Sequence, residues 1–277
     1  MDYKRVLTIQ DISCVGQCSL TVAMPILSAC GHETCILPSA VLSTHTAGFT
    51  GWTFTDLTED MPAIKNHWSN EGLKFDCIYT GYLGSKKQID YVTDIFNAVK
   101  KENGTLVVDP AMADNGNLYY GFDMDFVKEM AKLCATADYV LPNITEACFM
   151  TGVEYKEVYD RAYIDEVLTA LKKLGCKNIV LTGVSYSSDK TGVVVYENDT
   201  YNYYEHDRLP KGCHGTGDIY ASAFVGAYLK NNDAFKSAKI AADYAYECIR
   251  FTQANYPEHT YGCAFEPNLK KLINSIE

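Results

Sequence analysis

Lys211–Lys230 is a glycine-rich loop that runs into a predicted helix, and one acidic residue lies at the junction. Gly215 and Gly217 allow positive φ values and let an anion approach the backbone N–H groups of the loop. The free N–H groups of a first helical turn, together with the helix dipole, favour a bound phosphate at the same place. Asp218 could there take a proton from a hydroxyl while the N–H groups hold a phosphoryl group. A helix cap is the alternative interpretation of Asp218, and spacing alone does not decide between the two.

Further polar residues follow other predicted strands. Asp109 and Asp114 come after one strand, where two acids would suit a hard cation or a magnesium ion bound to phosphate. Asn143 and Glu146 are three residues apart on the first turn of a predicted helix, so they can share a metal. A capping box explains the same pair, and both interpretations fit. Asp11 follows the first predicted strand, as either a turn cap or a substrate contact.

The elements that must position these residues alternate between strand and helix. Strand 5–10, helix 19–30 and strand 33–37 give the β–loop–α–β order of a doubly wound, mostly parallel central sheet flanked by helices. Such sheets bind ligands at the carboxyl ends of their strands. Further strands are predicted at 76–80, 105–108, 139–141 and 178–182, with a hairpin at 191–196 and 201–206. Further helices are predicted at 57–70, 85–101, 122–133, 164–174, 233–252 and 266–275. No linker or repeat interrupts residues 1–277, so one α/β domain is expected.

The composition excludes several classes of partner. The net charge of −11 argues against a nucleic-acid partner, because phosphate backbones need a basic surface. The 11 cysteines include no C-x-x-C pair, so we expect reduced, mostly buried thiols and no zinc site. No long apolar segment opens the chain, so we expect no membrane partner and a cytoplasmic location.

His214–Asp218 reads HGTGD, and it resembles the GTGD signature of the ribokinase superfamily, more narrowly of its pyridoxal kinase branch. The resemblance extends over nearly the whole chain and implies a single-domain ribokinase-like fold. It also implies that Asp218 is the catalytic base. Gly215, Thr216 and Gly217 would then form the anion hole for the transferred phosphoryl group.

Two short motifs resemble parts of the substrate pocket in this branch. His45 and Thr46 match a His-Thr pair near the pyridine ring, and Tyr82 belongs to a Thr-Gly-Tyr element of the pocket. Asp11 departs from the pattern, because many pyridoxal kinases have serine at its position. An acid there could prefer the amine of pyridoxamine or hold a hydroxyl group, and a structural cap is the alternative.

A metal site of oxygen ligands is implied by further matches. Asn143 and Glu146 resemble the N-x-x-E motif that positions the magnesium of Mg-ATP. Asp109 and Asp114 resemble an acid pair near the phosphate and the cation. Mg²⁺ is therefore the implied cofactor, and a monovalent cation such as K⁺ is left open.

The resemblance also implies where ATP, the co-substrate, would bind. Thr182 and Gly183 match a threonine and a small residue that touch the ATP phosphates. Leu209 lies just before the glycine loop and should border the nucleotide. Asp109 and Thr216 complete the residues expected at ATP.

These matches predict an ATP-dependent kinase that phosphorylates the 5′-hydroxymethyl group of a B6 vitamer (pyridoxal, pyridoxine or pyridoxamine) in pyridoxal 5′-phosphate salvage. The family implies a homodimer. A hydroxymethylpyrimidine kinase of thiamine synthesis is the alternative, because such enzymes also have His before G-T-G. They usually have cysteine at the position of Asp218, however. A non-catalytic, nucleotide-binding sensor is the alternative from another class, and the intact Asp218, Asn143 and Glu146 argue against it. No P-loop, dinucleotide-binding or G-x-S-x-G motif occurs.

Overall fold

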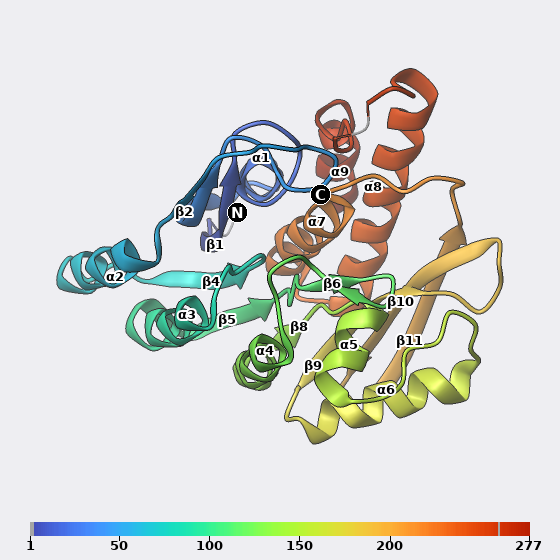
Figure 1. The fold of residues 1–277 in the computed structure, drawn as a ribbon, viewed down its shortest axis with the longest axis horizontal. Coiled ribbons are helices and arrows are strands. Elements are labelled where there is room, and N and C mark those ends of the chain that lie inside the picture. Colours follow the sequence, from blue (N-terminus) through green and yellow to red (C-terminus); the bar gives the residue numbers. More distant parts are fainter. Residues whose placement is uncertain (1–2, 260) are drawn as a thin grey trace.

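The computed structural model describes residues 3–259 and 261–277 and is organised around one large sheet (Figure 1). The strands of this sheet are β1 (Arg5–Ser13), β2 (Glu33–Leu42), β3 (Phe54–Asp56), β4 (Phe75–Thr80), β5 (Lys100–Val108), β8 (Tyr139–Val140), β9 (Asn178–Val184), β10 (Lys190–Glu197) and β11 (Thr200–Asp207). The two remaining strands, β6 (Ala113–Asp114) and β7 (Asn117–Leu118), pair with each other in a small hairpin.

The main sheet is parallel in its centre and antiparallel at both edges. Its order is β11-β10-β9-β8-β5-β4-β1-β2-β3. The neighbours from β2 across to β9 run parallel, whereas β3, β10 and β11 pair in antiparallel fashion. The expected α/β class with a mostly parallel central sheet is therefore confirmed.

The strand order reverses between β1 and β4, which places a topological switch point there. The chain passes from β1 to its neighbour β2 on one side and later continues from β4 to β5, β8 and β9 on the other. Connections that leave in opposite directions open a crevice at the carboxyl ends of the two strands, and ligands bind in such crevices. The residues that follow β1 and β4 are thus brought together by topology.

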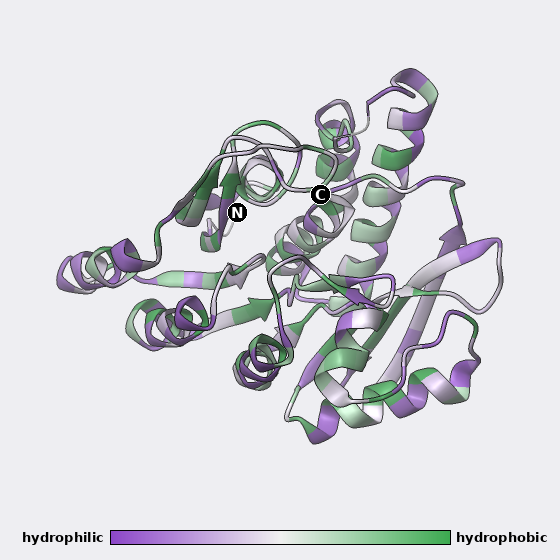
Figure 2. Ribbon diagram, viewed as in Figure 1, coloured by the Kyte–Doolittle hydropathy of each residue, from purple (hydrophilic) through white to green (hydrophobic). Residues whose placement is uncertain are grey.

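Helices cover both faces of the sheet (Figure 1). One face packs against α1 (Leu20–Ala29), α7 (Thr216–Asn231), α8 (Ala234–Asn255) and α9 (Leu269–Ile276). The other face packs against α2 (Met61–Asn70), α3 (Lys86–Val99), α4 (Met124–Thr136), α5 (Ile144–Thr151) and α6 (Arg161–Lys173). Figure 2 shows that apolar residues concentrate in the central strands, while the outer helices carry polar residues toward solvent. Each face therefore has its own hydrophobic core.

Helix α7 is buried on nearly all sides. Its residues from Ile219 to Ala227 are buried, as expected for a helix without a polar stripe. It packs closely on α1, because a Cβ at Gly226 would lie 2.4 Å from Sγ of Cys30. This contact fixes the direction in which the N-terminus of α7 points.

The predicted elements are confirmed, with several shifted ends. The helix predicted at 85–101 ends at Val99, and β5 already begins at Lys100, whose ammonium group binds the carbonyl oxygens of the next turn. The helix predicted at 57–70 begins as a 3₁₀ turn at Thr58–Asp60. The edge strand β3 was not predicted, because its three residues are all exposed and show no alternation.

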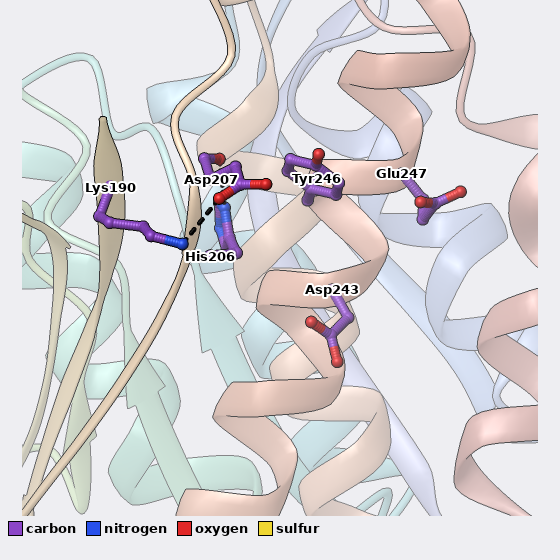
Figure 3. A pocket seen from close by; sticks show the side chains of 6 residues that line it. All are labelled: Lys190, His206, Asp207, Asp243, Tyr246 and Glu247. Carbon is purple, nitrogen blue, oxygen red and sulfur yellow. Dashed lines mark hydrogen bonds and ion pairs between the residues drawn. The ribbon is translucent and has the colours of Figure 1, made fainter. Parts of the chain in front are cut away.

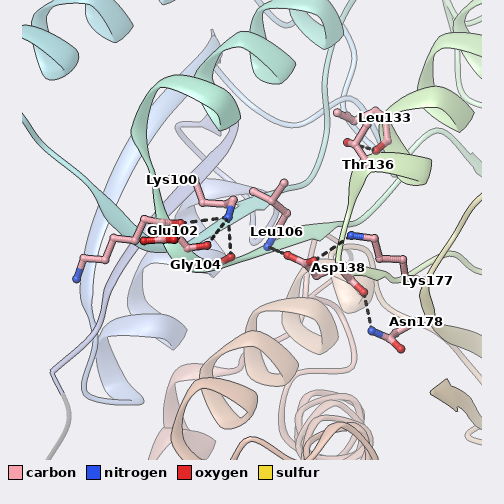
Figure 4. A network of polar contacts seen from close by, with 10 residues as sticks. Lys100, Glu102, Gly104, Leu106, Leu133, Thr136, Asp138, Lys177 and Asn178 are labelled. Atoms are coloured by element: carbon pink, nitrogen blue, oxygen red, sulfur yellow. Dashed lines mark hydrogen bonds and ion pairs between the residues drawn. The ribbon is translucent and has the colours of Figure 1, made fainter. Parts of the chain in front are cut away.

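The amino ends of the central strands are tied together by Asp138 (Figure 4). Its carboxylate accepts the N–H of Leu106 at 2.8 Å and lies 3.4 Å from the ammonium group of Lys177. Its carbonyl oxygen accepts from the amide of Asn178 at 3.0 Å. These contacts align β5, β8 and β9 at the edge opposite the switch point.

The cysteines are mostly buried free thiols, as their number and spacing predicted. All 11 cysteines are free and seven of them are buried, whereas Cys14 is exposed and Cys213 is half-buried. Within residues 3–259 and 261–277, no helix has the length and apolar character needed to cross a membrane.

Candidate active site

The sequence predicted that Asp11 follows the first strand, but it lies inside β1. The strand continues to Ser13, and its pairing with β2 shifts register between Gln10 and Ile12. A bulge of this kind changes the direction of neighbouring side chains and is common beside active sites. The extended strand carries Asp11 to the switch point between β1 and β4.

Asp218 is the third residue of α7, where Gly215 occupies the N-cap position. Its Oδ2 accepts the backbone N–H of Ser19, a residue far away in the sequence, at 2.9 Å. Asp218 is partly exposed, yet its carboxyl group is enclosed by protein. This burial raises its pKa to about 7, the Ser19 hydrogen bond opposes the rise, and the charge of Asp11 adds to it. The residue is thus no helix cap, and its pKa suits a general base at neutral pH.

The turn before Asp218 requires glycine at position 215. Gly215 has a φ of 76°, and a Cβ there would lie 1.8 Å from the carbonyl oxygen of Gln17. The Thr216 hydroxyl donates to the carbonyl oxygen of Cys213, and no side chain caps the first turn of α7. The N–H groups of Thr216 and Gly217 are therefore free of a side-chain cap, as an anion site at a helix N-terminus requires.

Asp11 is a buried acid in contact with two serines. It accepts the Ser13 hydroxyl at 3.1 Å. Burial raises the pKa of Asp11, and the nearby Ser19 and Ser13 side chains lower it in part. Burial, together with the charge of Asp11, raises the pKa of Tyr82 to about 12, so Tyr82 lies close to this acid. The structure therefore brings Asp11, Tyr82 and Asp218 together, and no cap role is seen for Asp11.

His45 is buried at the rim of the same region. Its Nε2 lies 2.8 Å from the carbonyl oxygen of Tyr261, and a Cβ at Gly16 would lie 2.1 Å from the imidazole ring. The ring centroid of His214 is 5.8 Å away. Among the described residues, Nδ1 of His45 has no hydrogen-bond partner, so it can still bind a ligand. Thr46, the next residue, is exposed.

Asp109 and Glu146 form a second acidic group. Asp109 directly follows β5, and its N–H donates to the carbonyl oxygen of Thr80 at 2.9 Å. Burial raises the pKa of both carboxyl groups well above the usual range. The charge of Asp218 adds to the rise at Asp109, and the charge of Asp109 adds to the rise at Glu146. Two buried acids that repel each other, with hard oxygen donors, fit a divalent cation.

Asn143 and Glu146 form the capping box that was one of their two interpretations. The N–H of Glu146 donates to Oδ1 of Asn143 at 2.9 Å, and the N–H of Asn143 donates to the Glu146 carboxylate at 2.8 Å. The Asn143 amide also donates to the carbonyl oxygen of Ala113 at 2.8 Å. Both ends of the Asn143 side chain are therefore in use.

Asp114, unlike Asp109 and Glu146, is exposed. It accepts from the backbone N–H of Asn115 at 2.9 Å. Within the ranges described, no three His, Cys, Asp or Glu side chains converge as a metal site. Asp109 and Glu146 are thus the part of the predicted metal set whose placement fits.

Thr182, one of the residues predicted to bind ATP, lies next to the start of α5. Thr182 bridges to Asn143, and its N–H donates to the carbonyl oxygen of Pro142 at 2.9 Å. Gly183 is exposed with a φ of 72°. Leu209 is half-buried in the segment before the glycine loop.

Two residues near these acids carried no usable sequence signal. Ser19 donates its N–H to Asp218 and lies near Asp11, as described above. Tyr119 follows the β6–β7 hairpin. Burial raises the pKa of its phenol, and the negative charges of Glu146, Asp114, Asp109 and Asp218 add to that rise. Its ring therefore lies within reach of both acidic groups, and only the fold places it there.

Two cavities lie away from these residues. Figure 3 shows the side chains that line one of them, between β10, β11 and helix α8, where the Lys190 ammonium group lies 2.7 Å from the Asp207 carboxylate. The volume of this cavity is about 410 Å³, and a second cavity of about 510 Å³ lies over α6. None of the predicted site residues lines either cavity.

Known proteins were then compared with this chain. A family model described as phosphomethylpyrimidine kinase matches residues 28–263. A provisionally assigned phosphomethylpyrimidine kinase from Bacteroides thetaiotaomicron VPI-5482, solved with pyridoxal, is 35% identical, with a TM-score of 0.91 over 98% of this chain and 96% of that one. Pyridoxal kinase from Lactobacillus plantarum is 31% identical, with a TM-score of 0.90 over 99% and 98% of the two chains.

Curated sequences give the same result. Pyridoxal kinase of Dictyostelium discoideum is 28% identical over 241 residues, which cover 80% of this chain and 77% of that protein. The expected relationship to ribokinase-like pyridoxal kinases is confirmed. Since the family model spans most of the sequence and the solved relatives match nearly all of the fold, the chain belongs to the phosphomethylpyrimidine kinase family.

Proposed function

We propose that this chain is an ATP-dependent kinase that transfers the γ-phosphoryl group to the 5′-hydroxymethyl group of a B6 vitamer, in the salvage of pyridoxal 5′-phosphate. The observation that carries the proposal is the placement of Asp218. A carboxyl group with a pKa of about 7 lies in the first turn of α7, behind an N-cap formed by Gly215. This arrangement pairs a proton acceptor with an anion site.

The residues divide the reaction between them. Asp218 accepts the proton of the substrate hydroxyl as its oxygen attacks the γ-phosphorus, and the bond from phosphorus to the leaving ADP oxygen breaks. The N–H groups of Thr216 and Gly217 offset the charge of the phosphoryl group in flight. Asp11 and Tyr82 border the space beside Asp218 where the vitamer ring would lie.

Asp109 and Glu146 are the residues that would hold Mg²⁺. Their carboxyl groups are buried, and the charge of Asp109 acts on Glu146. A bound magnesium ion would neutralise phosphate charge and orient the γ-phosphoryl group. Thr182 and Gly183, near the start of α5, would contact the ATP phosphates, and Leu209 would border the nucleotide. The homodimer stays a prediction, to be checked by the molar mass in solution.

Hydroxymethylpyrimidine is the second candidate acceptor. The family model that matches the chain is described by phosphomethylpyrimidine kinase activity, which favours it. The two acceptors share a heteroaromatic ring with a hydroxymethyl group, so a single base could serve both.

Direct assay tests the proposal. Purified protein with Mg-ATP would be offered pyridoxal, pyridoxine, pyridoxamine and hydroxymethylpyrimidine separately, with ADP and the phosphorylated product both measured. We expect turnover of at least one vitamer, with kcat/KM falling as the pH falls through about 7, because Asp218 must be ionised to accept a proton. Turnover of hydroxymethylpyrimidine alone would move the protein to thiamine synthesis. Absence of turnover in folded, ATP-binding protein would contradict the kinase.

Asp218→Asn isolates the base. We expect kcat to fall by about 10²–10⁴-fold, because the amide cannot accept the proton, while ATP binding is retained. Asp94→Asn, an exposed change on α3, is the matched control and should keep the parental rate. An Asp218→Asn variant with the parental kcat would refute the assignment of the base.

A further inference from the structure

Ser19 connects three parts of the site through its three polar groups. Its N–H donates to Oδ2 of Asp218 at 2.9 Å. Its side chain lies close enough to Asp11 to lower the pKa of that acid. Its carbonyl oxygen accepts the N–H groups of Val22 and Ala23 at 3.0 and 2.9 Å, which begins helix α1. One residue thus joins the acid on β1, the acid on α7 and the first turn of α1.

The backbone of Ser19 is strained. It has a φ of 54° and a ψ of −130°, in a region that L-residues rarely adopt. Among the described non-glycine residues, positive φ otherwise occurs only at asparagine and aspartate, at positions 115, 198, 199 and 232. Those four are exposed, whereas Ser19 is buried, with 6% of its surface exposed. A buried strained serine of this kind costs roughly 1–3 kcal/mol, and such residues concentrate at functional sites.

The strain is not needed to begin α1. The Ser19 hydroxyl makes no capping bond to the helix, so it does not act as an ordinary N-cap. Glycine would adopt the same φ and ψ without strain and would keep the same N–H group. What serine adds over glycine is a hydroxyl group near Asp11 and a backbone with less freedom.

We propose that Ser19 is a positioning residue for Asp218, whose N–H fixes Oδ2 so that Oδ1 is left for the substrate hydroxyl, while its restricted backbone keeps that N–H directed at the base. The inference rests on the proposed function, because it gives Asp218 the role of base. It adds a residue that touches neither phosphate nor metal and acts through another side chain.

The surroundings of Asp218 make this placement consequential. Two acids interact with its charge: Asp11 on β1 raises the pKa of Asp218, and Asp218 raises the pKa of Asp109 after β5. The charge of Asp218 also raises the pKa of three other titratable groups, Cys18 before α1, Tyr79 on β4 and Tyr119 after β7. Asp218 is thus held among like charges by the Ser19 hydrogen bond. A looser bond would leave the carboxylate less stabilised and less well aimed.

Ser19→Gly is the test, with turnover of the vitamer accepted by the parent as the readout. We expect the variant to fold with a Tm within about 3 °C of the parent, because relief of strain offsets the loss of the hydroxyl group. We expect kcat to fall about tenfold or more, since small misplacements of a reacting group are costly. The acid limb of kcat/KM should move to higher pH, and the KM for ATP should stay the same.

Asn232→Gly is the matched control, because it relieves a positive φ of 53° at the exposed end of α7. It should keep the parental kcat and pH profile. Ser19→Ala separates the two properties of serine, since it removes the hydroxyl and keeps the backbone restricted. Its kcat should fall by less than that of Ser19→Gly.

The outcomes distinguish the two proposals. A Ser19→Gly variant with parental kcat and an unmoved acid limb, in protein whose Asp218→Asn variant is inactive, overturns the role of Ser19 and leaves the kinase intact. Full activity of Asp218→Asn overturns the base and the role of Ser19 together. A lower Tm with unchanged kcat in Ser19→Gly would mean that Ser19 is structural, which also overturns the inference.

Discussion

Asp11 and Asp218 are neighbouring acids whose surroundings differ. Asp11 is 5% exposed and accepts the Ser13 hydroxyl, whereas Asp218 has the Ser19 N–H on one oxygen. Burial raises the pKa of both, and the charge of Asp11 contributes to the rise at Asp218. When Asp11 is ionised, the acceptor side of the site carries negative charge, which favours a substrate with an N–H donor or a positive charge.

Substitution of Asp11 tests this preference. In the parent we expect pyridoxamine, with its protonated amine, to have the highest kcat/KM among the three vitamers. Asp11→Ser should lower kcat/KM for pyridoxamine about tenfold and leave pyridoxal and pyridoxine within about threefold, because a hydrogen bond to a charged group contributes about 1.5–3 kcal/mol. Equal changes for all three vitamers would refute a charge-based selection and leave Asp11 as a structural acid.

The sequence was sufficient to identify some of these residues but not others. Asp218 was found because HGTGD places an acid after glycines at a helix start, and that local pattern survives folding. Ser19 and Tyr119 were missed because their partners are up to 199 positions away, and only the three-dimensional arrangement reveals them. Asp114 was assigned to the metal with Asp109, yet spacing could not show that it turns toward Asn115.

At the scale of elements, the packing of α7 on α1 sets the position of Asp218 in the first turn of α7. Gly226 allows it, since a Cβ there would lie 2.4 Å from Sγ of Cys30. The sequence predicted both helices but could not show which of their residues touch. The start of β5 was misjudged and β3 was missed for a related reason, because the pairing of neighbouring strands sets them.

Gly226→Ala tests the helix contact. We expect the free energy of unfolding to fall by about 1–3 kcal/mol, because the added methyl group overpacks a dense interface. Cys30→Ala removes the sulfur that the methyl group would meet. The double variant should therefore recover at least half of the loss in a urea-melt cycle. A single variant as stable as the parent, or a double variant with purely additive losses, would contradict the proposed close contact.

His32 links the same two elements in a pH-dependent way. Its ring is buried, and Nε2 lies 2.9 Å from the carbonyl oxygen of Gly226. Burial lowers the pKa of His32, and the hydrogen bond to Gly226 opposes this only in part. The unfolded chain therefore binds a proton more readily than the folded one. Stability is present above the unfolded pKa of about 6.5 and is lost as the pH falls below it.

His32→Gln measures this contribution, because glutamine can still donate to the Gly226 carbonyl oxygen but does not titrate. We expect the stability of the parent to fall relative to His32→Gln between about pH 6.5 and 5, by at most about 1.4 kcal/mol per pH unit. Asp218, Asp109 and Glu146 have raised pKa values and act in the opposite direction in both proteins, so the difference isolates His32. Parallel stability curves for the two proteins would refute the argument.

At the scale of the whole molecule, the fold brings buried acids from separate elements to one end of the sheet. Asp109 follows β5 and Glu146 lies on α5, and burial together with neighbouring charge raises the pKa of both carboxyl groups. This pair of buried acids destabilises the folded protein when both are ionised, because the two charges repel each other in a medium that solvates them poorly. A divalent cation would remove that repulsion and link the elements that carry the acids.

Thermal melts in the absence of nucleotide test this arrangement. With Mg²⁺ at ten times its Kd, we expect the Tm of the parent to rise by roughly 3 °C, since binding to the folded state alone adds about 1.4 kcal/mol. Asp109→Asn should melt at or above the parent without metal, because it removes a repulsive charge, and it should lose the Mg²⁺-dependent rise.

Asp114→Asn is the matched control: its acid is exposed and bonded to Asn115, so the rise should remain. Loss of the rise in Asp114→Asn but not in Asp109→Asn would place the cation at the exposed acid. An equal rise with K⁺ at the same ionic strength would show that the acids respond to screening and hold no specific divalent ion.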